Sequence, residues 1–195
     1  MASKIEKSWI LYDVANSAYV LVVVTAIMPV FFSDYAAKGL DDADKALWWG
    51  TANSLSSILV AIAAPVLGAF ADLPGNKTRF LKGFVVCGAL TTLLLPTIQT
   101  GQWIFAIVLF TIGTGAYSCA NVCYDSLLID VAESERMDRV SSLGYAWGYI
   151  GSCVPFVAIM LAFMFVPECY GIDVTKGAFI LTGVWWLVFS IPVFL

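Results

Sequence analysis

Six long apolar stretches dominate this 195-residue sequence and limit what it can fold into. Each is long enough to cross roughly 30 Å of hydrocarbon as a helix, which takes about 20 apolar residues. Hydrophobic residues make up 61% of the chain and charged residues only 12%, which excludes an ordinary water-soluble domain. The sequence therefore predicts an all-α, polytopic membrane protein, with residues 1–195 forming one bundle of helices at about 9–33, 46–71, 79–98, 102–126, 140–166 and 176–195.

Basic residues are distributed unevenly between the two ends of the predicted bundle. Seven lie on the side that holds the amino terminus, and three lie on the other side. Because cytoplasmic segments of membrane proteins carry an excess of Lys and Arg, we expect the amino terminus in the cytoplasm. The seven residues are Lys4, Lys7, Lys77, Arg79, Lys82, Arg136 and Arg139.

The connection between the second and third predicted helices holds the most informative short motif. Gly68 permits close helix contact, and Asp72 follows four residues later on the same helix face. Gly75 belongs to a tight turn, after which Lys77 and Arg79 lead into the next helix. The pattern predicts a cytoplasmic hinge that holds membrane helices in one of two arrangements.

Asp130 follows the fourth predicted helix, on the same side of the membrane as this hinge. We expect its carboxylate to pair with Arg79 or Arg139, because both cations fall at that side. Such a pair would form part of a cytoplasmic clamp between neighbouring helices.

Two predicted helices carry polar side chains at helical spacing within apolar surroundings. Asp13, Asn16 and Ser17 share a face of the first helix, and Asn121 and Asp125 share a face of the fourth. Polar groups inside a membrane are costly and usually face a cavity or a partner. The two helices run in opposite directions, so both stripes fall near the same end of the bundle. The candidate residues for a substrate or proton path are Asp13, Asn16, Ser17, Tyr19, Tyr117, Asn121 and Asp125.

The two aspartates each allow two interpretations. In the functional one, Asp13 exchanges a proton or binds a cationic group, while the amides and tyrosines orient a small polar solute. In the other, Asp13 lies near enough to its helix start to interact with the helix dipole and headgroup water. Asp125 follows so many helical residues that it already reaches the membrane interface. The residues alone leave both interpretations open.

The fifth predicted helix contains three glycines in one stripe, followed by a proline. Gly144, Gly148 and Gly151 let another backbone approach closely, and Pro155 can bend the same helix. We therefore expect this helix to pack tightly against a neighbour.

The hinge from Gly68 to Leu81 resembles the signature loop of the major facilitator superfamily. The residues at positions 73 and 76 depart from it, because Leu and Asn stand where that family usually has basic residues. Four stretches of the sequence, the hinge and residues 12–19, 29–32 and 141–149, together resemble a narrower group of proteins. This group is related to the fungal vacuolar amino-acid effluxers of autophagy. This resemblance implies a secondary transporter that moves a small solute, with amino acids as the best-known substrate class.

Members of that family have twelve helices in two six-helix halves, whereas this chain has six and ends at Leu195 without a polar tail. We expect it to be an amino-terminal half, whose partners are the lipid bilayer, a small-molecule solute, and a second six-helix half or another copy of itself. The bacterial relatives imply location in the inner membrane. The alternative is a membrane receptor or assembly subunit that does not transport.

Several functional classes are disfavoured by the composition. A formal charge of −4 argues against nucleic acid as a partner. The chain has no histidine, and the pair Cys119 and Cys123 is too small a ligand set for a metal, so we expect neither metal nor cofactor. Two Tyr-Asp pairs, at Asp13 and Asp125, superficially resemble an intramembrane aspartyl protease, but Asp125 lacks the glycine-rich context of such enzymes. We therefore expect no enzymatic activity.

Overall fold

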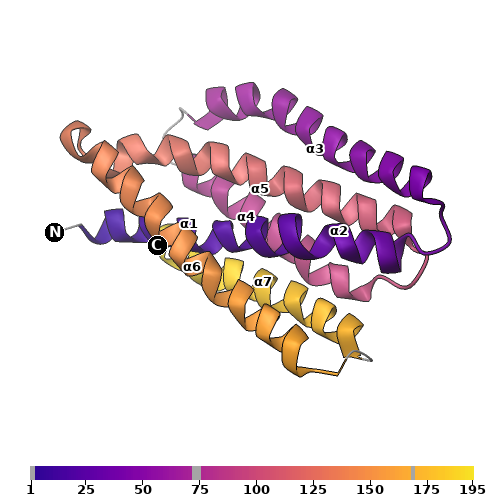
Figure 1. Cartoon of the computed structure of the whole chain (residues 1–195). Helices are drawn as coiled ribbons and strands as arrows, with labels where there is room; N and C mark the ends of the chain where they lie inside the picture. The colour runs from indigo at the N-terminus through magenta and orange to yellow at the C-terminus, as the bar shows by residue number, and fades with distance from the viewer. Residues whose placement is uncertain (1–2, 72–75, 168–169) are drawn as a thin grey trace.

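The structure, a computed structural model, describes residues 3–71, 76–167 and 170–195. Six helices in this part of the chain are long and apolar enough to cross a membrane, which confirms the predicted all-α class. They run back and forth along one bundle (Figure 1). The elements are α1 (Lys4–Ala18), η1 (Tyr19–Ile27), α2 (Met28–Phe31), η2 (Phe32–Ala36), α3 (Asp42–Ala71), α4 (Asn76–Leu94), η3 (Leu95–Thr97), α5 (Trp103–Val131), η4 (Ser134–Arg136), α6 (Met137–Phe165) and α7 (Gly171–Phe194).

The first span is one continuous rod of 33 residues, Lys4–Ala36, whose winding changes along its length. Its second half is mostly π-helical, in η1 and η2, where backbone amides bond five residues back, as from Met28 to the Val23 carbonyl. Pro29 explains the change, since it has no amide hydrogen and its ring would clash with the carbonyl of Thr25. The helix accommodates the proline by widening its turns.

The two chain ends lie at the same end of the bundle, here called the terminal end (Figure 1). The α5–α6 connection is at this end as well, while the connections from η2 to α3 and from η3 to α5 are at the opposite end. Helix α1 packs mainly against α6 and α7, α4 packs against α5 and α7, and α3 packs mainly against α5. The first span is therefore central, and α3 lies at the periphery.

Several helix ends differ from the sequence prediction. The first helix begins at Lys4 instead of residue 9, because Ser3 and Glu6 form a capping box at its start. The fourth span continues to Val131 instead of ending at 126, so Asp125 lies within the helix. The last helix begins at Gly171 instead of 176. The first and last spans were extended by stretches that include polar residues, which the apolar criterion left out, whereas the fourth was extended by residues 127–131, of which only Asp130 is charged.

The glycine stripe of α6 lies against α1, as expected from its spacing. A Cβ at Gly144 would meet the Trp9 ring at 2.7 Å, and one at Gly148 would lie 2.9 Å from Asp13 Oδ2. A Cβ at Gly151 would overlap both methyl groups of Val14. The absence of side chains at these positions lets α6 approach α1 closely, and the prediction of tight packing is confirmed.

The outer surface of the bundle is apolar. In the hydrophobic window of the first span 56% of residues are buried, but in that of α3 only 17% are buried. Large side chains such as Ile58, Ile62, Val157 and Val188 are about half exposed or more. A surface of this kind is stable only where hydrocarbon or another apolar protein surface covers it.

We predict that Gly151→Ala destabilises the bundle. The new methyl group would press on Val14, a β-branched residue that cannot move aside by a change of rotamer, so the loss is about 1–3 kcal/mol. Tryptophan fluorescence of the detergent-solubilised chain during heating measures it as a lower unfolding midpoint. Gly177→Ala on α7 is the matched control, because nothing lies within 4 Å of its added Cβ. Equal midpoints for the two variants would contradict the packing described here.

Candidate functional site

A cavity of about 570 Å³ lies between α1, α5 and α6, and it is called here the α1–α5–α6 cavity. It brings together six of the seven residues that the sequence suggested for a solute or proton path. Ligand pockets typically have volumes of about 300–1,000 Å³, so the cavity is large enough for a small solute. Its walls are Trp9, Asp13, Asn16, Ser17, Val20, Leu21, Thr25, Tyr117, Asn121, Tyr124, Asp125, Leu128, Ser141, Tyr145, Tyr149 and Ser152.

A side-chain hydrogen bond joins the two polar stripes across the cavity wall. Asn16 Nδ2 donates to Asn121 Oδ1 at 2.7 Å, between residues separated by 105 positions in the sequence. Ser17 Oγ in turn donates to Asn16 Oδ1 at 3.4 Å. Within a low-dielectric interior such bonds fix the orientation of both amides. The expected juxtaposition of the two stripes at one end of the bundle is therefore observed.

The seventh candidate, Tyr19, does not line the cavity. It is buried behind the wall, where its hydroxyl group lies 3.1 Å from Thr114 Oγ1. Its ring is 5.0 Å from that of Trp186, which is fully buried. Tyr19 therefore supports the helix contact from behind.

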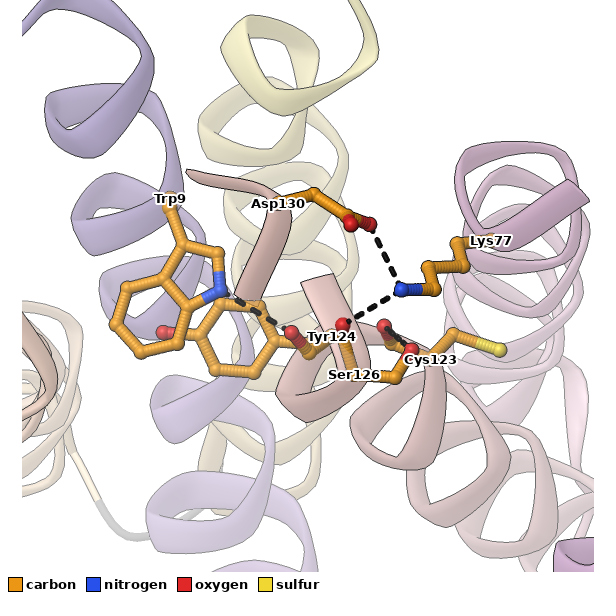
Figure 2. A network of polar contacts seen from close by, with 6 residues as sticks. All are labelled: Trp9, Lys77, Cys123, Tyr124, Ser126 and Asp130. Carbon is orange, nitrogen blue, oxygen red and sulfur yellow. Dashed lines mark hydrogen bonds and ion pairs between the residues drawn. The ribbon is translucent and has the colours of Figure 1, made fainter. Parts of the chain in front are cut away.

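An aromatic pair that the sequence analysis did not single out forms one wall of the cavity. The rings of Trp9 and Tyr124 stack with centroids 4.3 Å apart, and Trp9 Nε1 donates to the Tyr124 carbonyl at 3.1 Å (Figure 2). The Tyr12 ring lies 4.7 Å from that of Tyr124. These contacts attach the first turns of α1 to the last turns of α5, and they leave an aromatic face along the cavity.

Asp130 forms an ion pair between neighbouring helices as expected, but with a different cation. Lys77 Nζ lies 2.7 Å from Asp130 Oδ2 and donates to the Ser126 carbonyl at 3.0 Å (Figure 2). Asp130 thus pairs with Lys77 and not with Arg79 or Arg139 as expected. The reason is helical phase: α4 begins at Asn76, so Lys77 faces α5, and Arg79, two residues on, points away and is exposed.

The remaining hinge residues have mixed outcomes. Asp72 and Gly75 lie outside the described residues. Gly68 has no atom of the described structure within 4 Å of a Cβ built on it, so the close helix contact expected there stays a prediction. The peripheral position of α3 explains why no described atom lies that near, because little packs against its outer faces.

A second ion pair ties the α5–α6 connection to the start of α1. Arg136 Nη2 lies 2.9 Å from Glu6 Oε2, and the Glu6 side chain is only 3% exposed. The same carboxylate oxygen accepts from the Ser3 amide at 2.6 Å. The sequence analysis counted Arg136 only among the basic residues at this end, and it assigned no role to Glu6. The spacing of Ser3 and Glu6, which is typical of a capping box, was the signal available for one partner.

In the described residues, six helices that are long and apolar enough to span a membrane, three of them around a polar cavity, define the chain as an integral membrane protein. Its sequence matches the family model described as Major Facilitator Superfamily over residues 3–156. The chain belongs to the Major Facilitator Superfamily. A second family model, described as "Vacuole effluxer Atg22 like", matches residues 129–195. Both resemblances drawn from the motifs are thereby confirmed.

Curated proteins of bacteria and yeasts are similar to the chain. It is 38% identical, over 97% of its length, to the uncharacterized MFS-type transporter YxiO of Bacillus subtilis, of which it covers 46%. It is 25% identical over 72% of its length to Autophagy-related protein 22 of Pichia angusta, of which it covers 29%. The protein of that name from Saccharomyces cerevisiae is 23% identical over 95% of the chain, which covers 44% of it. The chain thus spans about half the length or less of these relatives. No solved structure matches it.

We predict that Glu6→Ala lowers the stability of the bundle more than Glu135→Ala does. Glu6 caps α1 and pairs with Arg136 while its own side chain is only 3% exposed, so its loss costs about 1–3 kcal/mol. Glu135 is exposed in the same connection, and its removal changes stability by less than about 0.5 kcal/mol. Thermal unfolding of the detergent-solubilised variants measures both. An unchanged midpoint for Glu6→Ala would show that the pair does not hold this connection.

Proposed function

We propose that the chain is the amino-terminal half of a secondary active transporter, which moves a small polar solute by alternating access. The observation that carries the proposal is the α1–α5–α6 cavity, where Asn16 and Asn121 from helices far apart in sequence bond to each other beside Asp13 and Asp125. Polar groups gathered at one cavity within apolar helices are costly in free energy, and where they occur they usually mark the pathway of a solute or ion. Family membership adds support.

The proposal includes a second six-helix half, or another copy of the chain, as the partner against which this bundle moves. Two observations support a partner: the chain covers about half of its curated relatives or less, and its apolar outer faces require cover. Alternating access arises when one bundle rocks against another around a shared site. The positive charges at the terminal end favour a cytoplasmic amino terminus, and the Bacillus relative favours the inner membrane of a bacterial cell.

Amino acids are the solute class that we propose, and Asp13 is the proposed site of proton coupling. The first rests on the match to the vacuole effluxer model and to the autophagy-related proteins. The second rests on position, since Asp13 lies at the cavity, only 9% exposed, on the central helix. A carboxylate there can gain or lose a proton as the cavity opens to one side or the other.

We predict that a transported amino acid stabilises the detergent-solubilised chain. At about 100 times its dissociation constant, a ligand adds about 2.7 kcal/mol, which raises the unfolding midpoint by roughly 5–10 °C. A screen of the common amino acids by thermal unfolding measures this. Asn16→Ala should remove the shift, because it breaks the bond to Asn121.

Asn53→Ala is the matched control for Asn16→Ala. Asn53 lies on α3, away from the cavity, and its amide bonds only to the Trp49 carbonyl one turn back. A ligand shift that survives Asn16→Ala, or that Asn53→Ala removes equally, would contradict the assignment of this cavity as the solute site.

Solute flux tests transport and coupling together. We expect the chain in liposomes to exchange the stabilising amino acid faster under an imposed pH gradient, and Asp13→Asn to lose that response. Gradient-dependent flux that is unchanged in Asp13→Asn would remove the coupling role. Binding without flux under any condition, in liposomes that also hold a second six-helix half, would favour the alternative, a receptor or assembly subunit.

A further inference from the structure

The charged residues that line the α1–α5–α6 cavity are all acidic. Asp13 and Asp125 both line it, and none of its sixteen lining residues is a Lys or Arg. Among the described residues, the ion pairs join Lys45 to Asp42, Lys77 to Asp130 and Arg136 to Glu6, so neither cavity aspartate takes part in one. The protein supplies two acidic groups at this site and no cation to balance them.

The nearly buried carboxylate of Asp13 requires a positive partner, while Asp125 is exposed and adds a second negative charge at the same cavity. Charged side chains within membrane segments pair with one another or mark the path of a substrate or ion, because an isolated charge is costly to desolvate. Asp13 is 9% exposed, and its Oδ2 lies against the α6 backbone at Gly148. The positive partner must therefore enter from the cavity side, as a proton, an inorganic cation or an organic cation.

The walls of the cavity favour an organic cation. Five aromatic residues from three helices line it, and the negative face of an aromatic ring attracts an ammonium group. A small inorganic ion prefers oxygen ligands and gains little from such walls. The five residues are Trp9, Tyr117, Tyr124, Tyr145 and Tyr149.

The hydroxyl group of Tyr124 is a further polar feature beside the cavity. The residue is 3% exposed, lines the cavity, and its hydroxyl oxygen is buried without a hydrogen-bond partner in the described structure. A buried hydroxyl group without a partner is costly, and most such groups in proteins are satisfied by a neighbour, a water or a ligand. Its oxygen can accept a hydrogen bond from an N–H donor, as can the carboxylates and Asn16 Oδ1.

We propose that this cavity binds the primary ammonium group of an organic amine between Asp13 and Asp125, and that a carboxylate on the solute contributes nothing to binding in this bundle. The inference rests on the proposed function, because it concerns the same cavity. It assigns recognition of the proposed amino acids to their ammonium group. An amino acid qualifies through its amine, and an amine without a carboxylate should bind as well.

Three probes of one carbon skeleton test the proposal on the detergent-solubilised chain. They are phenethylamine, phenylalanine and 3-phenylpropionate, chosen because an aryl group suits the aromatic walls. We expect the first two to bind with dissociation constants within about tenfold of each other and the third to bind at least about a hundredfold more weakly, by titration calorimetry at neutral pH in potassium chloride. Binding of 3-phenylpropionate as tight as that of phenethylamine would overturn the proposal.

Aspartate variants locate the amine. Asp13→Asn and Asp125→Asn keep side-chain shape but remove the charge, so each should weaken phenethylamine binding about tenfold or more. Asp173→Asn is the control, since Asp173 is an exposed aspartate at the start of α7, outside the cavity. Unchanged affinity in both cavity variants would overturn the assignment. The probe series on the unaltered chain still decides the question if a variant does not fold.

Two further measurements distinguish binding of an organic amine from binding of an inorganic cation, and failure of this inference from failure of the proposed function. Sodium chloride in place of potassium chloride should leave amine binding unchanged, and a sodium-specific thermal stabilisation that phenethylamine does not reproduce would overturn the organic cation. Asn16-dependent binding of a neutral solute, with no amine bound, would overturn the ammonium assignment but leave the proposed solute site intact. Binding of no solute at all would overturn both.

Discussion

The contact between α1 and α6 organises the rest of this bundle. Gly144, Gly148 and Gly151 present bare backbone to Trp9, Asp13 and Val14, so that the two helices approach closely. In lipid, where no hydrophobic effect drives helices together, association depends on such close packing and on polar contacts. The closeness has a functional result as well, because it brings the polar face of α1 to the wall of a cavity that α5 completes.

The sequence predicted more of the cavity than of the two ion pairs Lys77–Asp130 and Arg136–Glu6. The polar stripes could be found because helical periodicity relates Asp13 to Asn16 and Asn121 to Asp125 within single helices. The Trp9–Tyr124 stack could not, since it joins residues 115 positions apart that look like ordinary apolar and interfacial aromatics. All six spans were predicted, but their ends were displaced by up to five residues where polar residues such as Glu6 continue the helix.

The choice of cation at Asp130 illustrates the same limit. Lys77 and Arg79 are chemically similar and two residues apart, so only the start of α4 decides which one faces α5. Sequence patterns locate helix ends poorly, and an error of two residues turns a side chain to the opposite face. The partner of Arg136 was even less accessible, because Glu6 is 130 residues away.

The two ion pairs at the terminal end have a mechanical consequence. Lys77 joins α4 to α5, and Arg136 joins the α5–α6 connection to the first turn of α1. The two pairs thus brace these helix tips to one another. A push on the α5–α6 connection would be transmitted to the beginning of the central rod, and the surrounding tips would shift as one rigid piece.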